Sequence, residues 1–326
     1  MKGEKMYWSN YRIKCGVIYR VETSLLKLSK WRKINYILKE QIVHTYHTED
    51  KKIQTENFRA NLLGGEYMRI SSSDVKKRIR RYWDRRAYTY DRSPGHSPKD
   101  REIEVWKRLL KEKIEGNDTS CVLDVGTGTG FLSIMLTEMG FNVVGLDISR
   151  EMLRRAREKA KEMHIEFVQG DAENLPFKTE SFDAVVNRAV LWTLPDPERA
   201  LAEWKRVLKS GGRLCFFLHE IHPRGIIPWI QKQLRNILIL IFERRNPWNL
   251  RLKLNTPFNR GAAPTIMKNF IEACGLEPLS VEPMEEINKL RRESMPLYYK
   301  IVSNKHIQYC YTAIKLHNNR DKKDKK

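Results

Sequence analysis

Cysteine is scarce in this sequence, which holds five cysteines among 326 residues. They lie far apart and form no C-x-x-C pair, which argues against a disulfide scaffold and a cysteine-ligated zinc site and favours a reducing compartment. Long apolar runs are missing too: the longest, 237–242, falls far short of the roughly 20 residues that span a membrane. Residues 1–20 contain no continuous apolar stretch typical of a signal peptide, so we expect a cytoplasmic protein.

Negative charge is also in short supply. The chain has 40 Asp and Glu against 61 Lys and Arg, a net charge of +21, while apolar residues make up 41% and suffice for a core. Such a charge is typical of proteins with an anionic partner, such as nucleic acid or a membrane surface, but it is equally compatible with a basic, soluble surface. No separate RNA-binding module is evident, so nucleic acid stays a less favoured partner.

Residues 1–67 differ from the rest of the chain, with 13 Lys and Arg against 7 Asp and Glu and no clean hydrophobic period. One interpretation is a disordered or accessory extension. Another is that this stretch is not translated in the cell, because the Gly-Gly-Glu sequence at 64–66 can be encoded like a ribosome-binding site ahead of Met68. Folding signals begin straight after Met68, so we divide the chain into 1–67 and a domain over 68–326.

The rest of the chain predicts an α/β fold. Two helices come first, one through Val75, Ile79 and Trp83 and one after Asp100. Short apolar strands then alternate with helices, which predicts a parallel, doubly wound sheet. The strands are expected over 121–125, 142–146, 165–169, 182–187, 213–218, 279–281 and 307–314. The later helices are expected over 131–138, 150–163, from Asp196 to the glycines at 211–212, and over 265–273.

A glycine-rich turn joins the first strand to its helix. Residues 122–131 have the sequence V-L-D-V-G-T-G-T-G-F. Glycines allow the backbone to turn sharply and approach a ligand, and the helix N-terminus presents free N–H groups. Asp147 ends the next strand, where an acid can bind both ribose hydroxyls of a nucleotide. The nicotinamide fingerprint G-x-G-x-x-G would need a glycine where Phe131 stands, so a dehydrogenase is disfavoured.

The order D-x-G-x-G-x-G, which starts at Asp124, resembles motif I of class I S-adenosylmethionine-dependent methyltransferases. Five ordered motifs over roughly 120–218 are much more specific than one glycine loop. The chain resembles most the small-molecule branch that includes ubiquinone/menaquinone C-methyltransferases (methyltransferase type 11). The other four motifs are V-G-L-D-I-S at 144–149, G-D-A-E-N-L-P-F at 170–177, F-D-A-V-V-N at 182–187 and L-K-S-G-G at 208–212.

This resemblance implies a seven-stranded Rossmann-like fold, with N-terminal helices and a helical lid over 221–262, and S-adenosyl-L-methionine as the cofactor. It implies that Asp147 binds the ribose and Asp171 the adenine amino group, with the Ala172 backbone beside it, and that Asp124 lies near the methionine amino group. The expected cofactor-binding residues are Asp124, Gly126, Gly128, Gly130, Asp147, Ile148, Asp171, Ala172, Asn187 and Tyr90.

Residues 83–91 match a W-D…A…Y-D stretch that precedes the core in these relatives. The match implies an aromatic flap over the cofactor, in which Tyr90 lines the methionine end and Tyr88 assists. The alternative is that these aromatic side chains simply pack a helix against the sheet.

The general base is not evident from the sequence. Methyl transfer from a sulfonium is an in-line displacement, which needs alignment, a dry pocket and sometimes a base. Candidates are His219 and Glu220, which follow the fifth strand, and Tyr90; a solvated loop is the alternative for the first two. The order H-E-I-H at 219–222 is not H-E-x-x-H, so no metal is expected. Arg188 could pair with an acidic substrate or the cofactor carboxylate, or face water.

Nucleic-acid methylation has few of its usual signals. The fourth strand ends in N-R-A-V-L-W at 187–192 instead of Asp/Asn-Pro-Pro-aromatic, and no Pro-Cys pair is present, so base amino and cytosine C5 chemistry are disfavoured.

The insert 221–262 carries an apolar stripe at helical spacing. One interpretation of this stripe is a helix that forms a lid or a dimer contact. The alternative is an apolar entrance through which a lipophilic acceptor reaches the site, beside a membrane.

The sequence therefore predicts an enzyme that transfers a methyl group from S-adenosylmethionine to a small or lipophilic metabolite. Two alternatives stay open. One is an RNA or other nucleic-acid methyltransferase, which rests on the charge of +15 that remains when the chain is counted from Met68. The other is a non-catalytic S-adenosylmethionine-binding protein, because a fold does not determine a function. The acceptor atom and the oligomeric state, a homodimer included, are also open.

Overall fold

The computed structural model describes residues 72–93, 96, 98–115, 120–220, 226–242, 256–258, 261–297, 300 and 307–317. The segment 1–67, the alternatives for its role and the boundary at Met68 lie outside these residues. Within the described ranges, no helix combines the length and the apolar character needed to cross a membrane.

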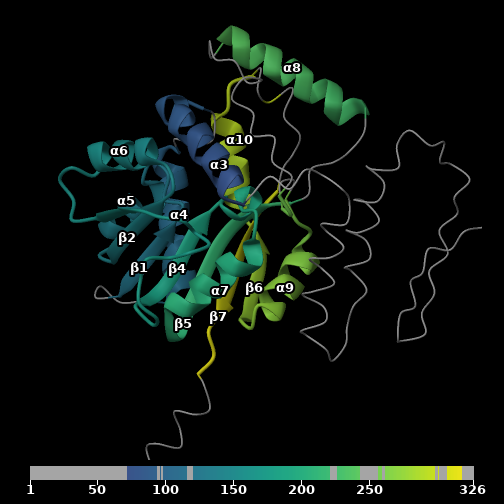
Figure 1. The fold of residues 1–326 in the computed structure, drawn as a ribbon. Helices are drawn as coiled ribbons and strands as arrows, with labels where there is room; N and C mark the ends of the chain where they lie inside the picture. Colours follow the sequence, from purple (N-terminus) through teal and green to yellow (C-terminus); the bar gives the residue numbers. More distant parts are fainter. Residues whose placement is uncertain are drawn as a thin grey trace, which may run out of the picture. The chain divides into compact units, whose positions relative to one another are not determined.

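A seven-stranded sheet forms the centre of the fold, with strand order β3-β2-β1-β4-β5-β7-β6 (Figure 1). Strands β1 to β5 pair in parallel, and β7 runs antiparallel to both β5 and β6. The predicted doubly wound, mostly parallel α/β sheet is thus confirmed. The strands are β1 (Cys121–Val125), β2 (Asn142–Asp147), β3 (Glu166–Gln169), β4 (Phe182–Arg188), β5 (Leu208–His219), β6 (Glu277–Pro283) and β7 (Gln308–Ile314).

Helices cover both faces of this sheet because successive strand residues point to opposite sides. Val122 packs with Trp106 and Ile287 in one core cluster, while Leu123 packs with Trp204 in the other. Helices α4, α5 and α10 therefore lie on one face and α7 and α9 on the other. The helices are α3 (Ser72–Arg86), α4 (Asp100–Ile114), α5 (Phe131–Glu138), α6 (Arg150–Lys159), α7 (Pro197–Val207), α8 (Ile226–Phe242), α9 (Pro264–Ala273) and α10 (Glu285–Ser294), with 3-10 turns η1 (Ala87–Thr89) and η2 (Leu191–Thr193).

The strand order reverses next to β1. From β1 the chain moves outward through β2 to β3 and then crosses back to β4, on the other side of β1. In open α/β sheets, ligands bind outside the carboxyl ends of the strands at such a switch point. The fold therefore directs attention to the ends of β1 and β4.

Two expected boundaries are wrong. The helix expected to reach 211–212 ends at Val207, and β5 begins at Leu208, so both glycines lie inside the strand. The pairing of β4 with β5 shifts register there, and Gly211 absorbs the shift with a φ of +79°. Helix α6 ends at Lys159 instead of 163, because its buried residues stop at Ala156 and the chain turns at Ala160.

Candidate functional site

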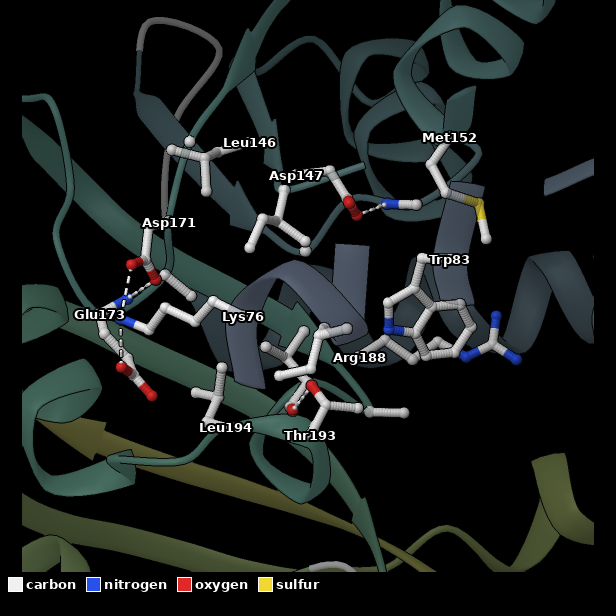
Figure 2. A pocket seen from close by; sticks show the side chains of 18 of the residues that line it. Lys76, Trp83, Leu146, Asp147, Met152, Asp171, Glu173, Arg188, Thr193 and Leu194 are labelled. Atoms are coloured by element: carbon white, nitrogen blue, oxygen red, sulfur yellow. Dashed lines mark hydrogen bonds and ion pairs between the residues drawn. The ribbon is translucent and has the colours of Figure 1, made fainter. Parts of the chain in front are cut away.

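A pocket lies at the carboxyl end of the parallel strands, between the glycine turn and helix α3 (Figure 2). The segments that follow β1, β2, β3 and β4 all contribute to it, as the switch point requires. The predicted cofactor residues that line it are Gly126, Gly128, Asp147, Ile148, Asp171, Ala172 and Tyr90. Their contact with a cofactor stays a prediction.

The glycine turn folds back onto β2. The backbone N–H groups of Gly126 and Thr127 both donate to the carbonyl of Leu146, at 2.7 and 2.9 Å. Gly126 has a φ of +69°, and a Cβ there would collide with the side chain of Val190. Only glycine fits at 126 for both reasons. By contrast, a Cβ on Gly128 would meet nothing nearer than the carbonyl oxygen of Gly126, at 4.0 Å, so the backbone is largely uncovered at the pocket wall.

Asp147 lines the pocket and is hydrogen-bonded to the glycine turn. Its carboxylate accepts from the N–H of Gly128 at 2.9 Å and from the N–H of Ser149 at 2.8 Å. Burial raises the pKa of Asp147 to about 6, in spite of these two hydrogen bonds. Because each carboxylate oxygen has more than one acceptor site, Asp147 can still accept hydrogen bonds from a ligand.

Asp124 and Gly130 lie beneath the pocket instead of lining it. Asp124 accepts from the N–H and the hydroxyl of Ser133, at 3.1 and 2.7 Å, and burial raises its pKa to about 6. Gly130 is the N-cap of α5, with a φ of +87°, and a Cβ there would press on Ala156 of α6. Both residues hold the first turn of α5, and their predicted contact with a cofactor stays untested.

Lys76 was missed by the sequence analysis, yet it closes one end of the pocket. Its ammonium lies 2.6 Å from Asp171 and 2.5 Å from Glu173. Figure 2 marks both ion pairs with dashed lines. Glu173 is only 1% exposed and also accepts from the N–H of Asp196 at 2.7 Å. Helix α3 is thereby fastened to the segment predicted to bind adenine. The only signal available was the spacing of Lys76 from Ile79 and Trp83, which places all three on one helix face.

The two acidic residues of the 83–91 stretch anchor it to the core. Asp84 accepts from the hydroxyl of Ser149, the N-cap of α6, at 2.7 Å. Asp91 accepts from the hydroxyl of Thr129 in the glycine turn, also at 2.7 Å. The 83–91 stretch is therefore tied to the glycine turn and to the start of α6, and its predicted role as a flap over the cofactor stays untested.

The aromatic residues of the flap divide into two groups. Trp83 and Tyr90 line the pocket, and their rings meet edge to face at 6.0 Å. Tyr88 is 54% exposed, faces the guanidinium groups of Arg154 and Arg155, and lies outside the lining, so the expected assistance from Tyr88 has no support.

Arg188 and Asn187 lie at the end of β4. Arg188 is among the residues that line the pocket, and its guanidinium lies over the rings of Phe131 and Trp106, at 4.6 and 5.5 Å. Burial lowers its pKa to about 10, so it stays cationic at neutral pH. Ala189 then adopts a φ of +59°, an uncommon conformation for a residue with a side chain. Such strained residues are found most often at functional sites.

The Asn187 amide has no hydrogen-bond partner among the described residues, although its side chain is 1% exposed. An unsatisfied buried polar group costs about 1–3 kcal/mol. Asn187 itself is not among the residues that line the pocket, so its predicted contact with a cofactor stays untested.

The catalytic candidates do not converge. Among the described residues, Tyr90 lines the pocket, whereas His219 and Glu220 do not. His219 pairs with Gln308 in the sheet, and the Glu220 N–H donates to the carbonyl of Ile307 at 2.9 Å. Burial raises the pKa of Tyr90, so its phenol stays protonated and is a hydrogen-bond donor. No group of His, Cys, Asp and Glu suited to hold a metal ion occurs within the described ranges.

Comparison with known proteins agrees with this geometry. Residues 123–216, from β1 into β5, match the family model described as a methyltransferase domain. The chain is 42% identical over 117 residues to a phosphatidylethanolamine N-methyltransferase of Cereibacter sphaeroides, a match that covers 35% of this chain and 57% of that protein. It is 40% identical over 109 residues to a demethylmenaquinone methyltransferase of Renibacterium salmoninarum, covering 33% of this chain and 45% of that one.

A solved structure shares the fold. Haemonchus contortus phosphoethanolamine N-methyltransferase 2, in complex with phosphomonomethylethanolamine and S-adenosylhomocysteine, superposes with a TM-score of 0.53 at 19% identity, over 76% of this chain and 61% of that one. The family match over residues 123–216 agrees with the resemblance drawn from the motifs, and the solved structure shows that the fold is shared. The chain spans only about half the length of the two curated relatives it matches above.

Proposed function

We propose that this protein transfers a methyl group from S-adenosyl-L-methionine to a small or lipophilic acceptor in the cytoplasm. The observation that carries the proposal is the buried Asp147 carboxylate, which faces the pocket directly beside the uncovered backbone of Gly128. A carboxylate that follows the second strand and adjoins a glycine turn is the arrangement that binds the ribose of a nucleotide. The cytoplasmic location rests on the scarcity of cysteine.

The residues present fit this cofactor. Asp147 would bind the ribose hydroxyls, and the segment from Asp171 to Ala172 the adenine. The space at Gly128 leaves room for a ligand against the backbone. The unsatisfied amide of Asn187, which directly precedes the lining residue Arg188, would offer the ligand a donor and an acceptor. When bound, the cofactor supplies a methyl group on a positively charged sulfur. The Asp147 and Asp124 carboxylates, both buried beside the pocket, favour a cation there.

The walls of the pocket fit an acceptor with an apolar body and an anionic or polar group. Trp83, Val190 and Leu194 supply apolar surface, while Arg188 supplies a cation at the end of β4. Close packing of α3 against the strand ends would exclude water and align the reacting groups, which an in-line displacement requires. The relatives named above support this class, since their names specify methyl transfer to phosphatidylethanolamine and demethylmenaquinone.

The test is transfer of label to a native cell extract. The full chain is incubated with methyl-labelled S-adenosylmethionine and extract, and label is measured separately in small metabolites, lipid, protein, RNA and DNA. We expect label in metabolites or lipid, lost in Asp147→Ala and retained in Asp183→Ala. Asp183 is a matched control because it also accepts a backbone N–H, from Cys121 at 2.9 Å, but lies at the start of β4.

Other outcomes would replace the proposal. Label confined to RNA or DNA would mean that nucleic acid is the substrate and that the net positive charge of the protein serves to bind it. Label confined to protein would also contradict a metabolite acceptor. Cofactor binding without label in any fraction would favour a non-catalytic S-adenosylmethionine-binding protein.

A further inference from the structure

Helix α8 presents a large apolar surface to solvent. Its exposed apolar side chains range from 44% accessible for Ile230 to 73% for Ile226. Contiguous apolar patches of this kind usually mark an interaction site. The exposed residues are Ile226, Trp229, Ile230, Leu234, Ile237, Leu240, Ile241 and Phe242.

Except for Phe242, these side chains share one face of the helix. The spacing from Ile226 through Ile230, Leu234 and Ile237 to Ile241 is four, four, three and four residues, which produces a single stripe. Among the side chains of α8 that the structure describes, the buried ones are instead Asn236 and Ile239. A helix of a globular protein normally turns its apolar stripe toward the core. In α8 the stripe is turned outward, so it needs a partner.

The charge of α8 and of the sequence that flanks it favours one kind of partner. The helix contains Lys232 and Arg235 and no acidic residue, and the whole insert 221–262 holds eight Lys and Arg against one Glu. Each basic residue near an anionic membrane surface contributes about 1 kcal/mol of attraction. A second copy of this chain would instead bring like charges together, which disfavours a dimer through this face.

The length of α8 favours a position on the bilayer surface. Its 17 residues extend about 26 Å, and two of them are basic, so it is suited to lie along the interface. Only the segment 221–225 separates it from Glu220, at the carboxyl end of β5, which limits the separation to roughly 20 Å. In Figure 1, α8 lies beyond the end of the sheet at which α3 lies.

We infer that α8 is an interfacial helix, which lays its apolar stripe on an anionic lipid bilayer and brings the pocket end of the sheet to the membrane surface. This inference is independent of the proposed methyl transfer, because the surface needs neither cofactor nor acceptor to bind lipid.

The test is flotation of the full chain with vesicles of phosphatidylcholine alone or with roughly one third phosphatidylglycerol. We expect binding to the anionic vesicles and little to the neutral ones, with a loss of binding in high salt. The double variant Ile237→Gln, Ile241→Gln should lower the partition coefficient by about tenfold or more, since two apolar side chains no longer enter the interface. Arg235→Gln should lower it by about fivefold.

The control is Leu279→Gln on β6, because Leu279 is 43% exposed and Ile237 is 45% exposed. This control should bind as the unaltered chain does, and thermal unfolding should show that every variant is folded. Equal binding by the double variant would overturn the inference. So would a dimer in light scattering that the double variant converts to a monomer, with no vesicle binding, because a second copy would then cover α8.

Discussion

Asp147 serves the fold and the proposed site together, since its carboxylate holds two backbone N–H groups while it faces the pocket. We expect Asp147→Ala to weaken binding of S-adenosylhomocysteine by about 2 kcal/mol, because a charged acceptor for the ribose hydroxyls is lost. Isothermal titration calorimetry measures this directly. Asp183→Ala should leave the affinity unchanged, and an unchanged affinity in Asp147→Ala would refute the role of Asp147.

The raised pKa of Asp147 predicts a pH dependence. With a pKa of about 6, the carboxylate is charged at pH 7.5 and is progressively protonated as the pH falls through 6. The charged form is the better acceptor, so affinity for S-adenosylhomocysteine should fall about fourfold between pH 7.5 and pH 5.5. Titrations across this range provide the check. In Asp147→Asn the dependence should be much flatter; an equally steep fall would assign it to another group.

Only those residues of the candidate site that belong to short sequence motifs could be predicted from the sequence. The glycine turn and Asp147 belong to short motifs, and the structure brings them together. Lys76 pairs with Asp171 across 95 residues, and no local pattern records such a pairing. Asn187 was predicted as a cofactor-binding residue. That its amide has no hydrogen-bond partner among the described residues depends on how several strands pack, which a sequence motif does not record.

At the scale of elements, the ion pair between Lys76 and the buried Glu173 helps to hold α3 at the strand ends. We expect Lys76→Met to lower the free energy of unfolding by about 2 kcal/mol, because Glu173 stays buried without its cation. Denaturant titration measures the change. Lys77→Met is the matched control, since the adjacent Lys77 pairs with exposed Asp74 and its loss should cost less than about 0.5 kcal/mol. Similar losses in both variants would contradict the special role of Lys76.

Elements with a strong hydrophobic period were predicted to within a few residues, and α5 and β1 match their expected ranges. Helix α10 was not predicted, since it is short and polar and buries little besides Ile287 and Arg291. The end of α7 was misplaced because the glycines at 211–212 serve a register shift inside β5 instead of a helix cap. Pairing between strands decides such positions, and a single sequence does not display it.

At the scale of the whole molecule, the net charge of +21 attracts both anionic lipid and nucleic acid. On our account, binding to RNA of mixed sequence is nonspecific. It should weaken by about tenfold or more between 50 and 200 mM salt and should lead to no methylation. Fluorescence anisotropy with a labelled RNA provides the measurement. Tight binding that persists at high salt would favour a nucleic-acid substrate.

The central claim is that the pocket between the glycine turn and α3 binds S-adenosylmethionine. The most direct test is a crystal structure of the full chain grown with S-adenosylhomocysteine. We predict the ribose hydroxyls at Asp147, the adenine beside Asp171 and Ala172, and a polar group of the ligand at the Asn187 amide. Density for the ligand elsewhere, or a pocket that stays closed by Lys76 at saturating ligand, would contradict the account.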